Sequence, residues 1–143
     1  MKPKKIEHLG IAVRNVEEAE ALYGSVLGMA VVARETLDAM KLKVVKVAVG
    51  ESVLELLEPL PGEEVISKFL ATHGPGIHHV CFEVEDVVAA SAELSTRGYR
   101  PIWDAPRVGA GRRLVTFLRP KECGGVLIEL NQPPDGPKSA PKT

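Results

Sequence analysis

The chain has 143 residues, of which 45% are hydrophobic and 26% charged, and its formal net charge is −1. This is the composition of a globular domain, and so small a net charge gives no electrostatic reason to expect binding to nucleic acid or to an anionic membrane. No apolar run approaches the roughly 20 residues that span a bilayer, and charged residues from Glu7 to Arg14 interrupt any signal-peptide core. Two cysteines without C-x-x-C spacing do not form a disulfide framework. We therefore expect a cytoplasmic protein with neither nucleic acid nor membrane as partner.

The first half of the chain predicts a strand, a helix and three further strands. An apolar run at 6–13 indicates the first strand. Asn15 is suited to cap a helix over 16–27, in which apolar residues recur at helical spacing, and Gly28 follows as its stop. Three β-rich runs then predict strands at 29–34, 42–49 and 53–57. Residues 50–52 join the last two strands as a tight hairpin.

The second half repeats this order. A strand is expected at 77–84, and Asp86 caps a predicted helix that ends at Gly98. Further strands are predicted at 99–103, 113–118 and 126–130. Each half is therefore a β-α-β-β-β module, a unit that does not bury its sheet face alone.

Two short motifs recur at matched places in the two modules. HLGIAV at 8–13 aligns with HVCFEV at 79–84, with apolar residues at the second, fourth and sixth places. Because those places face a helix-covered core, His8 and His79 point to the opposite face. His78 is expected either to be packed against its neighbours or to lie behind the ligand residues, and its role is left open. The second motif, E-L-x-x-P, ends the last strand of each module and begins with Glu55 and Glu129.

These recurring polar residues predict a metal site. A carboxylate within an apolar strand is costly to bury unless it is paired or coordinated. Two imidazoles and two carboxylates suit a divalent ion of the Zn, Co, Ni, Fe or Mn group, with positions left for a substrate. We expect the site to be formed by His8, Glu55, His79 and Glu129.

The repeat also predicts the fold class. We expect an α+β protein in which two tandem βαβββ modules form a half-open, mostly antiparallel barrel around a metal cleft. The prediction is a single domain over 1–143, with modules at about 5–60 and 76–132 and a flexible tail at 133–143.

The sequence resembles the vicinal oxygen chelate superfamily (glyoxalase, bleomycin resistance protein and dioxygenase) and, within it, the methylmalonyl-CoA epimerases. The resemblance extends from Ile6 to Gln132 and is carried by HLGIAV at 8–13, LELLEP at 54–59, GIHHV at 76–80 and RPKECGGVLIEL at 119–130. It implies that the same four residues are the metal ligands. It further implies one divalent ion per chain, Co(II) in the first place with Zn, Ni or Mn as alternatives, and a homodimer.

The resemblance also implies a reaction, the interconversion of the two C2 epimers of the acyl-CoA substrate methylmalonyl-CoA. Removing the C2 proton builds charge on the thioester oxygen, which a metal ion stabilises, and one proton carrier is needed on each face of C2. Mechanisms proposed for the family make Glu129 one carrier, as ligand and base together. The best-known bacterial members place the second base, a glutamate, on a strand that here reads KVVKVAV at 43–49 and has no acid. We expect Lys46 to be a surface lysine on an edge strand, so the second carrier is left unassigned.

Other interpretations stay open at this point. The VGAGRR loop at 108–113 is either a flexible hairpin or a mobile flap in which Arg112 or Arg113 meets a carboxylate or a CoA phosphate. A glyoxalase I-type lactoylglutathione lyase uses four similar ligands. An extradiol dioxygenase uses two histidines and one glutamate, so a carboxylate at Glu55 fits it poorly. A metal-free small-molecule binding module is the third alternative.

Overall fold

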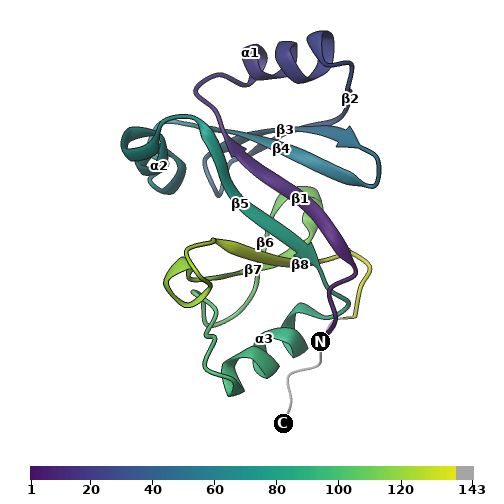
Figure 1. Cartoon of the computed structure of the whole chain (residues 1–143), viewed down its shortest axis with the longest axis vertical. Helices are drawn as coiled ribbons and strands as arrows, with labels where there is room; N and C mark the ends of the chain where they lie inside the picture. The colour runs from purple at the N-terminus through teal and green to yellow at the C-terminus, as the bar shows by residue number, and fades with distance from the viewer. Residues whose placement is uncertain (138–143) are drawn as a thin grey trace. The chain divides into compact units, whose positions relative to one another are not determined.

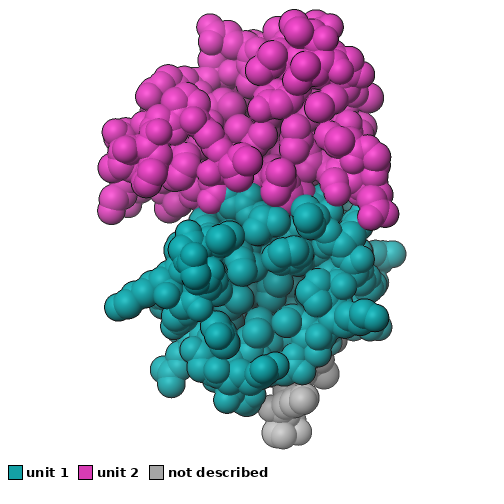
Figure 2. Space-filling model, viewed as in Figure 1, with its two compact units in different colours: residues 1–7, 79–143 teal, residues 8–78 magenta. Residues whose placement is uncertain are grey.

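The structure is a computed structural model and describes residues 1–137; the end of the predicted tail, at 138–143, lies outside the described residues. The chain forms two compact units (Figures 1 and 2). Unit 1 comprises Met1–Glu7 and His79–Thr143, and unit 2 comprises His8–His78. The first seven residues therefore belong to the same unit as the second half of the chain.

The first module contains four strands and three helical elements. Its elements are β1 (Lys5–Ala12), α1 (Val16–Glu20), the π-helical turns η1 (Ala21–Val26), β2 (Ala30–Leu37), β3 (Leu42–Val49), β4 (Ser52–Pro59) and α2 (Val65–His73). The strand order is β2-β3-β4-β1, in which β1 and β4 are parallel and the other neighbours are antiparallel.

The second module repeats the order of one strand, one α-helix and three strands, with two short 3-10 turns between its later strands. Its elements are β5 (Gly76–Glu83), α3 (Val87–Thr96), β6 (Arg107–Val108), η2 (Ala110–Arg112), β7 (Leu114–Leu118), η3 (Pro120–Glu122) and β8 (Ile128–Gln132). The strand order is β5-β8-β7-β6, again with one parallel pair, β5 and β8. The predicted βαβββ modules and the α+β class are confirmed.

Matched caps begin the first helix of each module. Asn15 Oδ1 accepts from the Glu18 amide at 2.9 Å, and Asp86 Oδ1 accepts from the Ala89 amide at 3.0 Å. Each side chain satisfies one of the helix's otherwise unpaired N–H groups. Both predicted caps are confirmed.

One face of each sheet packs under its helix. In unit 2 a core cluster on this face joins Ile11 and Val13 of the HLGIAV motif to Val16 of α1. In unit 1 the corresponding cluster joins Val84 to Val87 and Ala90 of α3. Since neighbouring side chains on a strand alternate between faces, His8 and His79 lie on the other face, as predicted.

Helix α2 was not expected from the sequence. Its first amides are satisfied by Glu63, whose carboxylate accepts from Val65, Ile66 and Ser67 at 2.9–3.0 Å. The helix buries Ile66 and Leu70 in a core cluster with Ala12, Leu42, Val44 and Leu57. Because Ala12 and Leu57 are on the same sheet face as His8 and Glu55, α2 covers one end of that face.

The strand predicted at 99–103 is wrong. Only Pro101 makes an isolated bridge, to Leu118, and the paired strand of this region is the two-residue β6. Pro101 has no N–H to donate, which limits ladder pairing on both sides of it. Within residues 1–137, no helix is both long enough and apolar enough to cross a membrane.

Candidate metal centre

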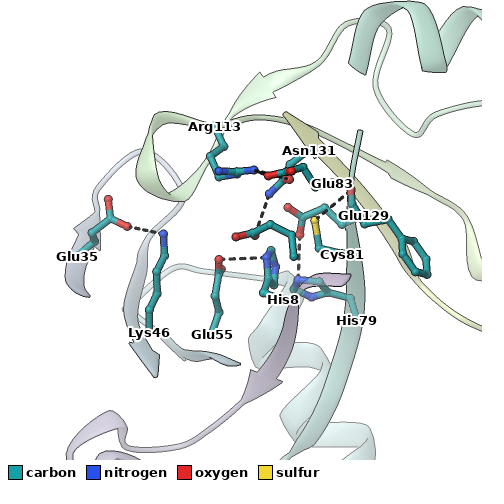
Figure 3. Close-up of polar contacts among 12 residues, drawn as sticks. His8, Glu35, Lys46, Glu55, His79, Cys81, Glu83, Arg113, Glu129 and Asn131 are labelled. Atoms are coloured by element: carbon teal, nitrogen blue, oxygen red, sulfur yellow. Dashed lines mark hydrogen bonds and ion pairs between the residues drawn. The ribbon is translucent and has the colours of Figure 1, made fainter. Parts of the chain in front are cut away.

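Unit 2 contributes one buried His–Glu pair (Figure 3). His8 Nδ1 lies 3.2 Å from Glu55 Oε2, and the two residues are only 2% and 6% exposed. The parallel register places Gly10 beside Glu55. His8, two residues before Gly10, therefore projects from the same face as Glu55. We call this the His–Glu face of unit 2.

Unit 1 contributes a second pair in the same register. His79 Nε2 lies 2.9 Å from Glu129 Oε1, and both residues are 6% exposed. Cys81, two residues after His79, pairs with Glu129 just as Gly10 pairs with Glu55. The residues that recur in the sequence therefore form the same kind of His–Glu pair, in the same strand register, in each of the two units.

The chemistry of these side chains fits a divalent metal ion. Each unit brings one imidazole and one carboxylate together on a buried surface, and both groups are common ligands of borderline divalent ions. Leaving a carboxylate in such a place without a partner is costly.

Lys46 is not on an edge strand, which corrects the prediction made from sequence. Strand β3 lies between β2 and β4, and Lys46 is directly opposite Glu55 in the β3–β4 ladder. Its side chain is 15% exposed, and its Nζ lies 3.4 Å from Glu35 Oε2. Lys46 therefore projects from the His–Glu face of unit 2 (Figure 3).

In unit 1 an aromatic residue occupies the position that corresponds to Lys46. Phe117 is directly opposite Glu129 in the β7–β8 ladder. Its ring meets the His79 ring edge-on at 5.6 Å and the Trp103 ring edge-on at 5.5 Å. The guanidinium group of Arg107 lies over the Trp103 ring, 4.2 Å from its centroid. The edge-on contact with Phe117 limits the rotation of the His79 ring.

Arg113, named in the sequence analysis for the loop at 108–113, contacts residues of its own unit. Its Nη2 donates to Glu83 Oε1 at 2.5 Å and to Asn131 Oδ1 at 3.3 Å, and Asn131 Nδ2 donates to Glu7 Oε1 at 3.1 Å. Arg112 is exposed. The loop is a turn between two antiparallel strands, as the hairpin interpretation expects.

The fourth residue of each E-L-x-x-P motif has a function that the sequence analysis missed. Glu58 Oε1 accepts from the Val16 amide at 2.9 Å, and Gln132 Oε1 accepts from the Val87 amide at 2.8 Å. Each side chain ties the last strand of its module to the first residue of its helix. The recurrence of an amide or carboxylate at this place was the signal that could have revealed it.

Two other polar groups lie apart from these pairs. The ring of His78 meets Phe69 edge-on at 5.0 Å, which agrees with the packed position, one of the two alternatives expected for it. Arg34 forms two hydrogen bonds to Glu20, at 2.8 and 2.9 Å, and these lower the pKa of the Glu20 carboxyl group. Glu20 and Arg34 line a surface pocket whose lining contains none of the four predicted ligands.

Comparison with known proteins defines the class. A model of the Glyoxalase/Bleomycin resistance protein/Dioxygenase superfamily matches residues 7–117. The chain belongs to this superfamily, which confirms the resemblance noted in the sequence.

Within the superfamily the chain is similar to methylmalonyl-CoA epimerases. It is 39% identical over 129 residues to the mitochondrial methylmalonyl-CoA epimerase of Mus musculus, a match that covers 90% of this chain and 72% of that protein. The crystal structure of methylmalonyl-CoA epimerase from Mycobacterium tuberculosis matches with a TM-score of 0.87 and 34% identity, over 92% of this chain and 89% of that one. A methylmalonyl-CoA epimerase in complex with methylmalonyl-CoA and NH4+ matches with a TM-score of 0.89 and 32% identity, over 94% and 98% of the two chains.

Proposed function

We propose that this chain is an enzyme that interconverts the two C2 epimers of methylmalonyl-CoA. The observation that supports this most directly is its similarity, over nearly its whole length, to an epimerase solved with methylmalonyl-CoA. The two buried His–Glu pairs supply the side chains that such chemistry needs. A lactoylglutathione lyase, another metalloenzyme of the superfamily or a metal-free binding module are the alternatives.

The proposed metal ligands are those predicted from the sequence. One divalent ion per chain, with Co(II) as the first candidate and Zn, Ni or Mn as alternatives, would be held by His8, Glu55, His79 and Glu129. When bound, the ion would supply Lewis-acid stabilisation of negative charge on the substrate's carbonyl oxygen.

The proton chemistry is assigned to the chain's own residues. Glu129 is proposed to remove the C2 proton through a carboxylate oxygen, and the electron pair of the broken C–H bond then delocalises into the thioester carbonyl. Glu129 is only 6% exposed, which would limit the access of water to this carboxylate. A positioned base of this kind contributes a rate factor of about 10²–10⁴.

The test follows deuterium at C2. Purified protein is freed of metal with a chelator and incubated in D2O with (2R)-methylmalonyl-CoA, with and without added Co(II). We expect deuterium incorporation and appearance of the 2S epimer only in the metal-loaded sample. The hemithioacetal of methylglyoxal and glutathione serves as control substrate. Turnover of the hemithioacetal without exchange of methylmalonyl-CoA would replace the proposal by the lyase, and binding without turnover of either would favour the binding module.

We also propose that the chain forms a homodimer and acts in the cytoplasm on a small acyl-CoA, without nucleic acid or membrane as partner. The sequence resemblance supports the dimer. Closed symmetric pairs are also the commonest oligomers of soluble proteins. Light scattering at micromolar concentration should give twice the chain mass, and a monomer there would contradict the dimer.

A further inference from the structure

Methylmalonyl-CoA has two chemically different parts, and the proposed chemistry involves only one of them. The acyl thioester reacts, whereas the CoA part carries a diphosphate and a 3′-phosphate on its adenosine. Arginine suits such groups, because its planar fork of N–H groups can donate two hydrogen bonds to one phosphate. An arginine with this function is expected on the same surface as the reacting group, with its charge available for an anion.

We propose that Arg107 binds a phosphate group of the CoA part of the substrate. Arg107 is directly opposite Val115 in the β6–β7 ladder, and Val115 is two residues from Phe117. Directly opposite residues project from the same face, and so do alternate residues of one strand. Arg107 therefore projects from the face of the sheet that carries His79 and Glu129. All of these residues belong to unit 1.

A series of contacts leads from the proposed ligands to Arg107. The centroids of the His79 and Phe117 rings are 5.6 Å apart, and those of Phe117 and Trp103 are 5.5 Å apart. The guanidinium group of Arg107 follows, 4.2 Å from the Trp103 centroid. The pantetheine arm of CoA is a long flexible chain between the thioester and the diphosphate, and it can span this series. A substrate whose thioester lies beside Glu129 can therefore place its phosphates at Arg107.

The charge of Arg107 is available for an anion. Arg107 is exposed, and its side-chain partner within residues 1–137 is the Trp103 ring, not a carboxylate. A cation–π contact restricts the position of a guanidinium group without neutralising its charge. Arg113, its diagonal neighbour on the same face, differs in this respect, because it forms an ion pair with Glu83. Of these two neighbouring arginines, only Arg113 has its charge balanced within the unit.

The sequence around Arg107 is strongly basic. Residues 100–119 contain five arginines and a single acidic residue, Asp104, whereas the whole chain has a net charge of −1. Arg112, at the turn between β6 and β7, and Arg119, after β7, are both exposed. Positive charges gathered in one segment repel one another and attract a polyanion. The phosphate groups of CoA have the charge that complements this segment.

The inference rests on the proposed function, so its test compares two thioesters that share the reacting group. Methylmalonyl-pantetheine has the acyl group and the arm of methylmalonyl-CoA but lacks the phosphates and the adenosine. In Co(II)-loaded Arg107→Gln we expect the KM for methylmalonyl-CoA to rise about tenfold, the effect of losing one charge-assisted hydrogen bond, with kcat unchanged. The kinetic constants for methylmalonyl-pantetheine should equal those of the wild type.

Two further variants separate binding from structure. Arg107→Lys keeps the charge and should have an intermediate KM for methylmalonyl-CoA, because an ammonium group binds phosphate only as a point charge. Arg97→Gln removes the same charge from an exposed arginine at the end of α3, which packs on the other face of the sheet, and should change neither KM. Equal losses for both thioesters in Arg107→Gln would mean that Arg107 only supports Trp103, and would overturn the inference.

A direct measurement of binding needs neither turnover nor metal. Trp103 is the single tryptophan of the sequence, so its fluorescence reports on ligands bound beside it. Titration of metal-free wild-type protein with CoA should give a saturable change, and pantetheine should give none. The Kd for CoA should rise about tenfold in Arg107→Gln.

The two proposals fail in different ways. No saturable change in the wild type, or an equal Kd for CoA in the wild type and in Arg107→Gln, would overturn the role of Arg107. Absence of C2 exchange in metal-loaded wild-type protein would instead overturn the proposed function, and the CoA titration would still decide whether Arg107 binds phosphate.

Discussion

Glu129 lies directly across the β7–β8 ladder from Phe117. The matched glutamate of the first module, Glu55, lies across from Lys46. The sequence repeat treats the two glutamates alike, but the residue opposite one of them in the ladder is aromatic and the residue opposite the other is a lysine. The structure thus distinguishes the two glutamates where their sequence motifs do not.

The first prediction uses this difference. Glu129→Gln keeps an oxygen ligand and the side-chain shape but removes the base, so C2 proton exchange should fall by about 10²–10⁴-fold while much of the metal is retained. Glu55→Gln should weaken metal binding, because one negative charge is lost, yet spare turnover at saturating metal. Exchange at C2 and metal content are measured in parallel on both variants. Near wild-type exchange by fully metallated Glu129→Gln would show that another group carries the proton.

The second prediction concerns the contacts that hold the helices to the sheets. Glu58→Ala leaves the Val16 amide without its acceptor and should lower the free energy of unfolding by about 1 kcal/mol. Glu58→Gln should be close to neutral, since Gln132 makes the equivalent hydrogen bond in the other module. Urea denaturation of both variants checks this. Equal losses would mean that the negative charge, and not the hydrogen bond, stabilises the helix.

The third prediction concerns Thr116, which is fully buried on β7 and whose hydroxyl has no hydrogen-bond partner among residues 1–137. Thr116→Val replaces the hydroxyl by a methyl group of similar size and should raise the free energy of unfolding by about 1 kcal/mol. Thr96→Val is the control, because the Thr96 hydroxyl is exposed and donates to Glu93 O at 2.6 Å. A lower melting temperature for Thr116→Val would show that its hydroxyl is satisfied in solution.

The fourth prediction concerns the ion pair between Arg113 and Glu83, whose side chains are 17% and 14% exposed. Removing one partner leaves a largely buried charge, so Arg113→Met should cost about 3 kcal/mol of unfolding free energy. The double variant with Glu83→Met should be more stable than Arg113→Met alone, because no charge is then left unpaired. Arg112→Met, at the exposed neighbouring position, should change stability by less than about 0.5 kcal/mol.

The elements that could be predicted from sequence are those in which the spacing of apolar residues matches the side chains that are buried in the structure. Strand β3 has the predicted bounds, and both helix caps are at the predicted asparagine and aspartate. Helix α2 was missed because its amides are satisfied by Glu63, a residue type that is not among the usual caps.

Lys46 could not be placed from sequence for a different reason. Alternation along a strand tells which residues share a face, but whether a strand is at the edge of a sheet depends on strand order, a property of distant pairings. The His–Glu pairs could be found only because the repeat showed the same two residue types at the same two places.

The assignment of Met1–Glu7 to unit 1 has a consequence for any attempt to divide the protein. The Lys4 amide donates to Glu83 O at 2.8 Å, and Glu7 accepts from Asn131, so the leading residues supply contacts to elements that follow residue 79. A fragment beginning at His79 would lack these partners, and adding residues 1–7 through a short linker should restore them. The sequence repeats and the compact units therefore have different borders in this chain, so a cut placed between the repeats would separate the leading segment from the elements it contacts.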